Sequence, residues 1–134
     1  MRIRDVMTSD LPAVSPGDTV GHAARRMREA KVRALPVCEG SRLEGIITDW
    51  DVTCAVAAGE DPARRPVAEC MSTELVAARP EALLDECAEM MADRRIHHLL
   101  VCDGDHFEGM VHLGVSWSQL GGMDTPMATF TAPI

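Results

Sequence analysis

Two polar side chains with a suggestive spacing, Thr48 and Asp51, close the stretch GIITDWD at residues 45–51. A carboxylate offers two acceptor oxygens to a pair of adjacent hydroxyl donors, and a threonine hydroxyl can both donate and accept. A threonine followed three residues later by an acid is also a plain helix-start pattern. The spacing therefore predicts either a contact with a small polar ligand or a helix cap.

A second version of this stretch lies sixty-four positions further along, where residues 109–115 read GMVHLGV. The glycine and the apolar pair recur, but His112 stands in place of Thr48 and Val115 in place of Asp51. A valine accepts no hydrogen bond, and leaving a buried hydroxyl unpaired costs about 1–3 kcal/mol. The second version therefore lacks both polar residues of the first.

Histidines and a cysteine near the second version raise the alternative of a metal site: His97, His98, His106, His112 and Cys102. Side chains alternate along a strand, so His97 and His98 would point to opposite faces and could not easily bind one ion. We predict no metal site.

No nucleophile–base pair and no pair of acids suited to catalysis is visible, so we expect a protein that is not an enzyme.

The chain contains five cysteines, with no C-x-x-C spacing among them: Cys38, Cys54, Cys70, Cys87 and Cys102. An odd number without a secretory leader fits reduced thiols, and we expect buried cysteines in a cytoplasmic protein. A redox role for Cys38 and Cys102, at equivalent ends of matching strands, is the alternative. No run of eighteen apolar residues occurs, so we expect no membrane-spanning segment.

The charge of the chain limits its partners. The formal net charge is −8, which argues against nucleic acid or an anionic membrane as the main partner. Residues 1–66 hold 10 basic and 10 acidic residues, whereas residues 67–134 hold 3 and 11. An anionic ligand would therefore need local positive charge, which lies mostly in the first half. Apolar residues make up 46% and aromatic residues 3%, so the core must be aliphatic.

The chain is an internal repeat. Residues 7–45 laid over 71–109 without a gap give twelve identities in thirty-nine positions, against about two or three expected by chance. A repeat at a fixed offset indicates two copies of one structural unit. We place the first repeat, with its connector, at 1–66, the second at 67–120, and a loose tail at 121–134, with docking of the tail on a partner copy as the alternative.

Each repeat is predicted to run β-α-β-β-α, which gives an α/β (α+β) fold. In the first repeat, Asp18 or Thr19 can cap a helix in which Val20, Ala23 and Met27 recur at helical spacing. The other expected elements of that repeat are strands at 11–14, 34–38 and 43–48 and a helix at about 50–58. The second repeat predicts strands at 75–78, 99–102 and 107–112, a helix from about 83, and a last helix at about 114–120.

Several short stretches carry a family resemblance: VMT at 6–8, Val14–Pro16 as V-x-P, VRALPV at 32–37, IHHLLV at 96–101, and GIITDWD. With these, residues 1 to about 120 resemble a tandem pair of cystathionine-β-synthase (CBS) domains, the Bateman module. The stretch LPVCEGSRLEGIITDWDV followed by AAGEDP is also similar to small stand-alone bacterial CBS proteins of the hypoxic-response type.

The resemblance implies two repeats packed about a pseudo-twofold axis, with clefts between them that take adenine nucleotides or other adenosyl compounds. It implies a homodimer and a regulatory sensor read by an unknown effector protein. The expected regulatory ligands are AMP, ADP, ATP or S-adenosylmethionine, with no required cofactor. A module with empty clefts, used only for protein assembly, is the alternative function.

The resemblance also implies one competent cleft per chain and one impaired cleft, since the second would need Thr and Asp where His112 and Val115 stand. It assigns roles to residues of the competent cleft. Asp51 would bind both ribose hydroxyls, with Thr48 near the ribose and phosphate and Ile46 packed on the base. The remaining residues would line the base pocket or contact phosphate: Val76 and Ala77 for the base, and Arg33, Arg95, His97 and His98 for the phosphate. The basic residues could instead form an ordinary solvated edge.

Overall fold

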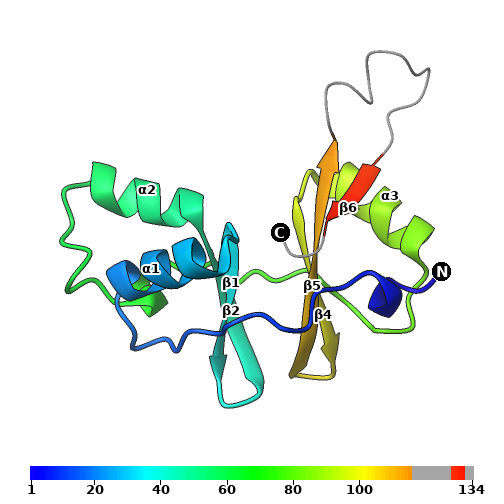
Figure 1. Cartoon of the computed structure of the whole chain (residues 1–134), viewed down its shortest axis with the longest axis horizontal. Coiled ribbons are helices and arrows are strands. Elements are labelled where there is room, and N and C mark those ends of the chain that lie inside the picture. Colours follow the sequence, from blue (N-terminus) through cyan, green and yellow to red (C-terminus); the bar gives the residue numbers. More distant parts are fainter. Residues whose placement is uncertain (116–127, 132–134) are drawn as a thin grey trace. The chain divides into compact units, whose positions relative to one another are not determined.

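The computed structural model describes residues 1–115 and 128–131 (Figure 1). Its secondary structure contains two single-turn 3-10 helices, three α-helices and six strands within the described residues. In chain order they are η1 (Ile3–Asp5), α1 (Val20–Ala30), β1 (Ala34–Glu39), β2 (Arg42–Thr48), α2 (Asp49–Ala57), η2 (Val67–Glu69), β3 (Ala77–Ala78), α3 (Leu84–Arg94), β4 (His98–Asp103), β5 (His106–Val115) and β6 (Ala128–Thr131).

The chain folds into two compact units. The first-repeat unit comprises residues 10–75 together with 105–107. The second-repeat unit comprises residues 1–9, 76–104 and the described residues from 108 onward. The units therefore do not coincide with the two repeats. Residues 1–9, which begin the first repeat, belong to the second-repeat unit, and residues 67–75, which begin the second repeat, belong to the first-repeat unit.

The first-repeat unit consists of the β1–β2 hairpin with α1 and α2 beside it (Figure 1). Helix α1 begins where Thr19 Oγ1 accepts a hydrogen bond of 3.1 Å from the His22 amide. Its apolar side chains Val20, Ala23 and Met27 are buried, as the helical spacing predicts. The hairpin turns at Gly40, whose φ of +63° lies in the left-handed region that favours glycine.

The second-repeat unit packs α3 against β4 and β5. Cys87 and Met91 of α3 form one buried cluster with residues of both strands, completed by Ile3 near the start of the chain; the strand residues are Leu99, Val101 and Val111. Burial of a side chain of this size stabilises the fold by about 1.5–3 kcal/mol. Beyond this cluster, β3 pairs in parallel with β4, and β6 pairs antiparallel with β5.

The exchanged leading segments explain why a glycine recurs at positions 45 and 109. The amides and carbonyls of Ile46 and Ser72 are joined by hydrogen bonds of 2.9 and 3.0 Å, so residues 71–72 lie against β2. A Cβ atom on Gly45 would come within 2.8 Å of both the Ser72 carbonyl oxygen and the Met71 sulfur. Only a residue without a side chain lets these backbones approach so closely.

The same contact recurs in the second-repeat unit. Thr8 and Met110 exchange backbone hydrogen bonds of 2.9 and 3.0 Å. A Cβ atom on Gly109 would lie 2.9 Å from the Thr8 carbonyl oxygen and from the Met7 sulfur. The two contacts are therefore equivalent, since Ile46 and Met110 are sixty-four residues apart, as are Thr8 and Ser72. The leading segment of each repeat lies against the hairpin of the other repeat.

Three sequence predictions differ from the structure. The strand expected at 11–14 is reduced to one parallel bridge between Val14 and Val37, because Pro12 and Pro16 lack the amide hydrogens that a longer ladder needs. The helix expected at about 114–120 is wrong at its start, since β5 continues through Val115; residues 116–120 lie outside the described residues. Of the tail expected to be loose at 121–134, residues 128–131 form β6; residues 121–127 and 132–134 lie outside the described residues.

Apart from β5, which runs three residues beyond the strand expected at 107–112, the other predicted strands and helices are confirmed within one or two residues. For the membrane, none of the helices in residues 1–115 and 128–131 is long and apolar enough to span a bilayer.

Candidate functional site

Thr48 and Asp51 lie at the junction of β2 and α2, and their side chains are bonded to each other. Asp51 Oδ2 accepts a hydrogen bond of 2.8 Å from the Thr48 amide and one of 3.1 Å from the Thr48 hydroxyl. The Asp51 amide in turn donates to Thr48 Oγ1 at 3.3 Å. This reciprocal arrangement is a capping box, in which two backbone donors at the start of the helix are satisfied. The helix-cap reading of the motif is therefore confirmed.

The cap leaves part of the Asp51 carboxylate available. Both of its hydrogen bonds end on Oδ2, and within the described residues no donor reaches Oδ1. The side chain is partly buried, in the first turn of α2. The positive end of a helix dipole and the remaining amides of this turn favour negative charge here, whether it belongs to Asp51 or to a ligand. The cap therefore orients the carboxylate without using both of its oxygens.

Two further predicted site residues lie at the same edge of the first-repeat unit. The Arg33 carbonyl accepts a hydrogen bond of 2.9 Å from the Asp49 amide, so the start of β1 lies beside the start of α2. The Arg33 side chain is exposed. Ile46 is half-buried and stands two residues before Thr48, on the same face of β2, because the buried Ile47 between them faces the other way. The structure thus brings together Thr48, Asp51, Arg33 and Ile46.

The other five predicted site residues belong to the second-repeat unit. Val76 is half-buried and packs against the cluster under α3. Ala77 is exposed on β3, beside a hollow of about 400 Å³ that also touches Arg79 and Asp103. Arg95 ends α3 with a left-handed φ of +56° and is exposed. The last two, His97 and His98, precede and begin β4, the first exposed and the second half-buried.

The second repeat ends its hairpin differently from the first. His112, at the position equivalent to Thr48, stacks on His98 with ring centroids 4.9 Å apart and planes inclined by 28°. In the first repeat the equivalent cross-strand pair is Ala34 and Thr48. Beyond this point β5 continues to Val115, whereas β2 gives way to α2. A strand that continues offers no exposed helix amides, so the equivalent end of the second hairpin has a different chemistry.

A small hollow that the sequence did not predict lies beside Asp51. It measures about 210 Å³, and its lining includes Cys54, Arg65 and Cys70. Arg65 Nε lies 3.0 Å from a Glu60 carboxylate oxygen, and its Nη1 lies 3.4 Å from one of Glu69. A hydrogen bond with the Cys70 side chain, and then these two carboxylates, raise the pKa of the Arg65 guanidinium. The spacing of four residues between Arg65 and Glu69 was the available sequence signal for this ion pair.

Two of the buried cysteines, Cys38 and Cys87, have the properties of inert thiols. Burial, and then the nearby charge of Glu44, raise the pKa of the Cys38 thiol. Burial and the charge of Glu86 do the same for Cys87. A raised pKa keeps each thiol protonated at neutral pH and therefore weakly nucleophilic. Within residues 1–115 and 128–131, no group of three or more histidine, cysteine or acidic side chains is placed to hold a metal ion.

Comparisons with known proteins place this geometry in a family. A family model described as the CBS domain matches residues 3–58 and 67–114. The chain is similar to the CBS domain-containing protein YhcV of Bacillus subtilis (strain 168), with 37% identity over 112 residues that make up 84% of this chain and 80% of that protein.

Two solved structures show the same fold. The crystal structure of Hypoxic Response Protein I with two coordinated zinc ions is 28% identical, with a TM-score of 0.74, and the match covers 84% of this chain and 92% of that one. The CBS domain pair of protein MJ0100, in complex with 5′-methylthioadenosine and S-adenosyl-L-methionine, is 22% identical, with a TM-score of 0.76 and coverage of 84% and 89%. The second likeness concerns the fold alone.

Proposed function

This chain belongs to the CBS domain family, and we propose that it is a regulatory CBS-domain pair whose Thr48–Asp51 turn binds the ribose of an adenosyl ligand. Pairs of CBS domains are typically regulatory, ligand-binding modules. The observation that carries the proposal is the Asp51 carboxylate, which the cap holds by Oδ2 while no described residue bonds to Oδ1. A carboxylate fixed in this way is suited to adjacent hydroxyl donors, which in a nucleoside are those of the ribose.

The neighbours of Asp51 suit the rest of such a ligand. The exposed Arg33 side chain supplies positive charge at the same edge of the sheet, and a phosphate group pairs well with a guanidinium. Ile46, half-buried on the Thr48 face of β2, offers an apolar contact for a base. In the protein MJ0100 this fold holds adenosyl compounds, which shows that the fold is compatible with them. Here the residues around Asp51 are what support the assignment.

The proposal includes one such site per chain. The position equivalent to Thr48 holds His112, already stacked on His98, and the position equivalent to Asp51 is Val115, within a strand. No carboxylate stands there to accept hydrogen bonds from ribose. The roles that the resemblance gives to Val76, Ala77, Arg95, His97 and His98 stay predictions, as do the homodimer and the effector protein that would respond to the ligand.

Calorimetry of the purified protein with AMP, ADP, ATP and S-adenosylmethionine tests the proposal. We expect submillimolar binding of at least one of them, and a loss of about tenfold or more in affinity for Asp51→Ala, because ribose hydroxyls would lose their acceptor. Asp49→Ala is the matched control, since Asp49 is an exposed acid in the same helical turn. Asp51→Ala also weakens the cap by about 0.5–2 kcal/mol, so affinity is measured well below its melting temperature.

The capping box itself favours a second function, a CBS-domain pair that binds no nucleotide and serves protein assembly. In that case Thr48 and Asp51 only begin α2. A bound ligand at a hundredfold excess over Kd raises stability by about 2.7 kcal/mol. A melting temperature that none of the four compounds changes, with no heat of binding, would therefore favour the assembly module and reject the adenosyl site.

A further inference from the structure

Two of the five cysteines differ from the others in their exposure. Cys38, Cys87 and Cys102 are buried, whereas Cys54 is exposed and Cys70 is half-buried. The sequence-based expectation of buried cysteines is therefore wrong for Cys54 and Cys70. All five are free thiols. A thiol reacts only where an oxidant can reach it, so these two are the cysteines suited to redox chemistry.

Cys54 and Cys70 line one small hollow, although they are sixteen residues apart. Cys54 lies on α2, one turn beyond Asp51, and Cys70 follows directly after the short helix η2. Both side chains line the hollow of about 210 Å³ beside Asp51. Both residues also belong to the first-repeat unit. Their proximity is therefore fixed within one compact unit.

Backbone hydrogen bonds hold both cysteines at the wall of the hollow. The Cys54 carbonyl accepts a bond of 3.0 Å from the Ala58 amide at the end of α2. The Cys70 amide donates to the Val67 carbonyl at 2.9 Å, and two residues later Ser72 is bonded to β2. A cysteine has a single rotatable bond before its sulfur, so each thiol can turn within the hollow while its backbone stays in place.

Arg65 distinguishes the chemistry of Cys70 from that of Cys54. A guanidinium carries only donors, so in the hydrogen bond between Arg65 and Cys70 the sulfur is the acceptor. Glu60 and Glu69 hold the guanidinium at nitrogen–oxygen distances of 3.0 and 3.4 Å, and they offset part of its positive charge. A donated hydrogen bond favours a thiolate, which is the form of cysteine that attacks a peroxide. Cys70 is therefore suited to attack first, and the exposed Cys54 to supply the second thiol.

We propose that Cys54 and Cys70 are a redox-active pair, which a hydroperoxide such as hydrogen peroxide oxidises to a disulfide across the hollow. The Cys70 thiolate attacks one peroxide oxygen and the O–O bond breaks, which leaves a sulfenic acid on Cys70 and hydroxide, which takes up the thiol proton as water. The Cys54 sulfur then attacks the Cys70 sulfur, and the S–O bond breaks to release a second water. Two thiols and one hydrogen peroxide thus give one disulfide and two waters.

The disulfide would join α2 to the segment that leads into the second repeat, within the first-repeat unit. It closes a loop of sixteen residues, which restricts the unfolded chain and should raise the melting temperature by about 5 °C. It would also occupy part of the hollow beside Asp51. Neither effect depends on the adenosyl ligand.

Titration of the reduced full chain with hydrogen peroxide tests the pair. After the remaining thiols are alkylated in denaturant, mass spectrometry should show three labelled cysteines in place of five and the loss of two hydrogen atoms, about 2 Da. Dithiothreitol should restore all five. A glutamate-specific protease separates Cys54, Cys70 and Cys87, because cleavable glutamates lie between them. The digest should therefore contain one linked pair of peptides, joined at Cys54 and Cys70.

Variants assign the role of each residue. In Cys54→Ser the sulfenic acid on Cys70 has no second thiol and should be trapped by dimedone, whereas Cys70→Ser should give neither the adduct nor the bridge. Arg65→Gln should slow the oxidation of Cys70 by about threefold or more. Arg64→Gln is the matched control, since the Arg64 side chain is 88% exposed and lies 3.8 Å from Asp61. Circular dichroism checks that every variant is folded.

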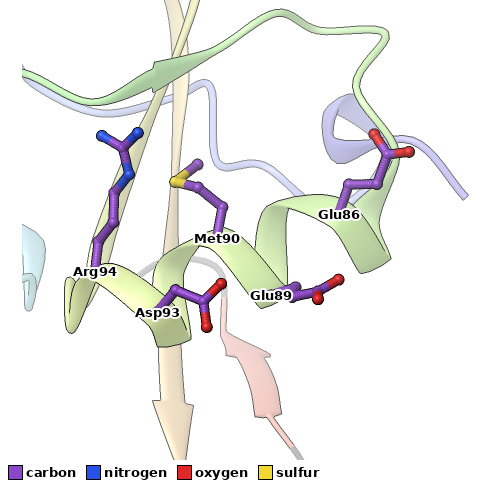
Figure 2. A pocket seen from close by; sticks show the side chains of 5 residues that line it. All are labelled: Glu86, Glu89, Met90, Asp93 and Arg94. Atoms are coloured by element: carbon purple, nitrogen blue, oxygen red, sulfur yellow. The ribbon is translucent and has the colours of Figure 1, made fainter.

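A second sulfur provides an internal reference for indiscriminate oxidation. Figure 2 shows Met90 on α3, where it lines a separate hollow of about 320 Å³ with Glu86, Glu89, Asp93 and Arg94. Met90 is half-buried, as Cys70 is, and its oxidation to the sulfoxide adds one oxygen, about 16 Da. We expect the disulfide to be complete at peroxide concentrations that leave Met90 unchanged.

The outcomes decide the proposal. A bridge between Cys54 and Cys70 that forms before Met90 is oxidised, and raises the melting temperature, supports it. It is overturned if Met90 is oxidised first, if the linked peptides join two of the buried cysteines, or if the disulfide connects two chains. An unchanged oxidation rate in Arg65→Gln would reject the activation of Cys70 by Arg65.

Discussion

The two repeats agree in their backbones and differ in their polar chemistry. Helices α1 and α3 both end with a residue in the left-handed conformation, Lys31 at φ +59° and Arg95 at φ +56°. Both hairpins turn at a glycine of nearly equal φ, +63° at Gly40 and +65° at Gly104. These features recur because the backbone geometry of the fold requires them, independently of any ligand.

The difference lies where the hairpins end. Thr48 and Asp51 close β2 with a capping box and start α2. His112 stacks on His98, and β5 continues past it to pair with β6. The comparison teaches that the close backbone contacts define the scaffold, whereas the polar residues at the strand end can be replaced without losing it. A strand that ends in a capped helix start and a strand that continues can therefore share one fold.

The largest effect is expected where the repeats are most alike. Gly45→Ala and Gly109→Ala should each lower the free energy of unfolding by about 1–3 kcal/mol, because the added Cβ would overlap a backbone oxygen that cannot rotate away. Urea denaturation measures both. Gly17→Ala is the control, since no atom lies within 4 Å of its added Cβ and its φ is not positive. A large loss in one variant and none in the other would break the equivalence of the two contacts.

A medium effect is expected from exchanging the helix starts. Thr19 caps α1 through its hydroxyl, whereas Leu83 at the start of α3 makes no side-chain cap and is 43% exposed. Thr19→Ala should destabilise by about 1 kcal/mol, and Leu83→Thr should stabilise by up to about the same amount. Thermal unfolding of both variants checks this. If Leu83→Thr gave no gain, the contact of Leu83 with its surroundings would outweigh a cap.

The smallest effect on stability is expected at the helix ends. Lys31→Gly and Arg95→Gly each remove the strain of a side chain in the left-handed region, partly offset by greater freedom of the unfolded chain. We expect a gain of about 0.5–1 kcal/mol for each in thermal unfolding. Of these two variants, only Arg95→Gly should also weaken the binding of AMP in calorimetry, since the resemblance assigns a phosphate contact to Arg95 and none to Lys31. Equal AMP affinity of the two variants would indicate that Arg95 has only a structural role.

The repeated letters of the sequence were enough to predict most helices and strands, since burial at Val20, Ala23 and Met27 follows directly from their spacing. They could not predict the exchange of leading segments. An offset of sixty-four residues relates Met7 to Met71 without saying which hairpin each one covers. The end of the second hairpin was also missed, because the helix expected there was inferred from the first repeat, where a capping box starts it.

The candidate site could also be predicted only in part, but for a different reason. The spacing of Thr48 and Asp51 is compatible with either a helix cap or a ligand contact. In the structure the two residues form the cap, and Asp51 Oδ1 has no partner among the described residues. The ion pairs of Arg65 depend on how residues 60–70 fold back beside α2, which local spacing does not specify. Sequence reasoning finds chemistry within one element more readily than chemistry between segments.

The exchanged leading segments have a consequence for synthesis on the ribosome. Thr8 bonds to Met110 and Ser72 to Ile46, so the first hairpin can be completed soon after it emerges, while the partner of Thr8 is made some hundred residues later. At about 5–20 residues per second, residues 7–8 wait about 5–20 seconds for their strand. The second-repeat unit is therefore the last to fold during translation. Neither repeat could be cut from the chain at residue 66 without depriving both hairpins of a neighbouring segment.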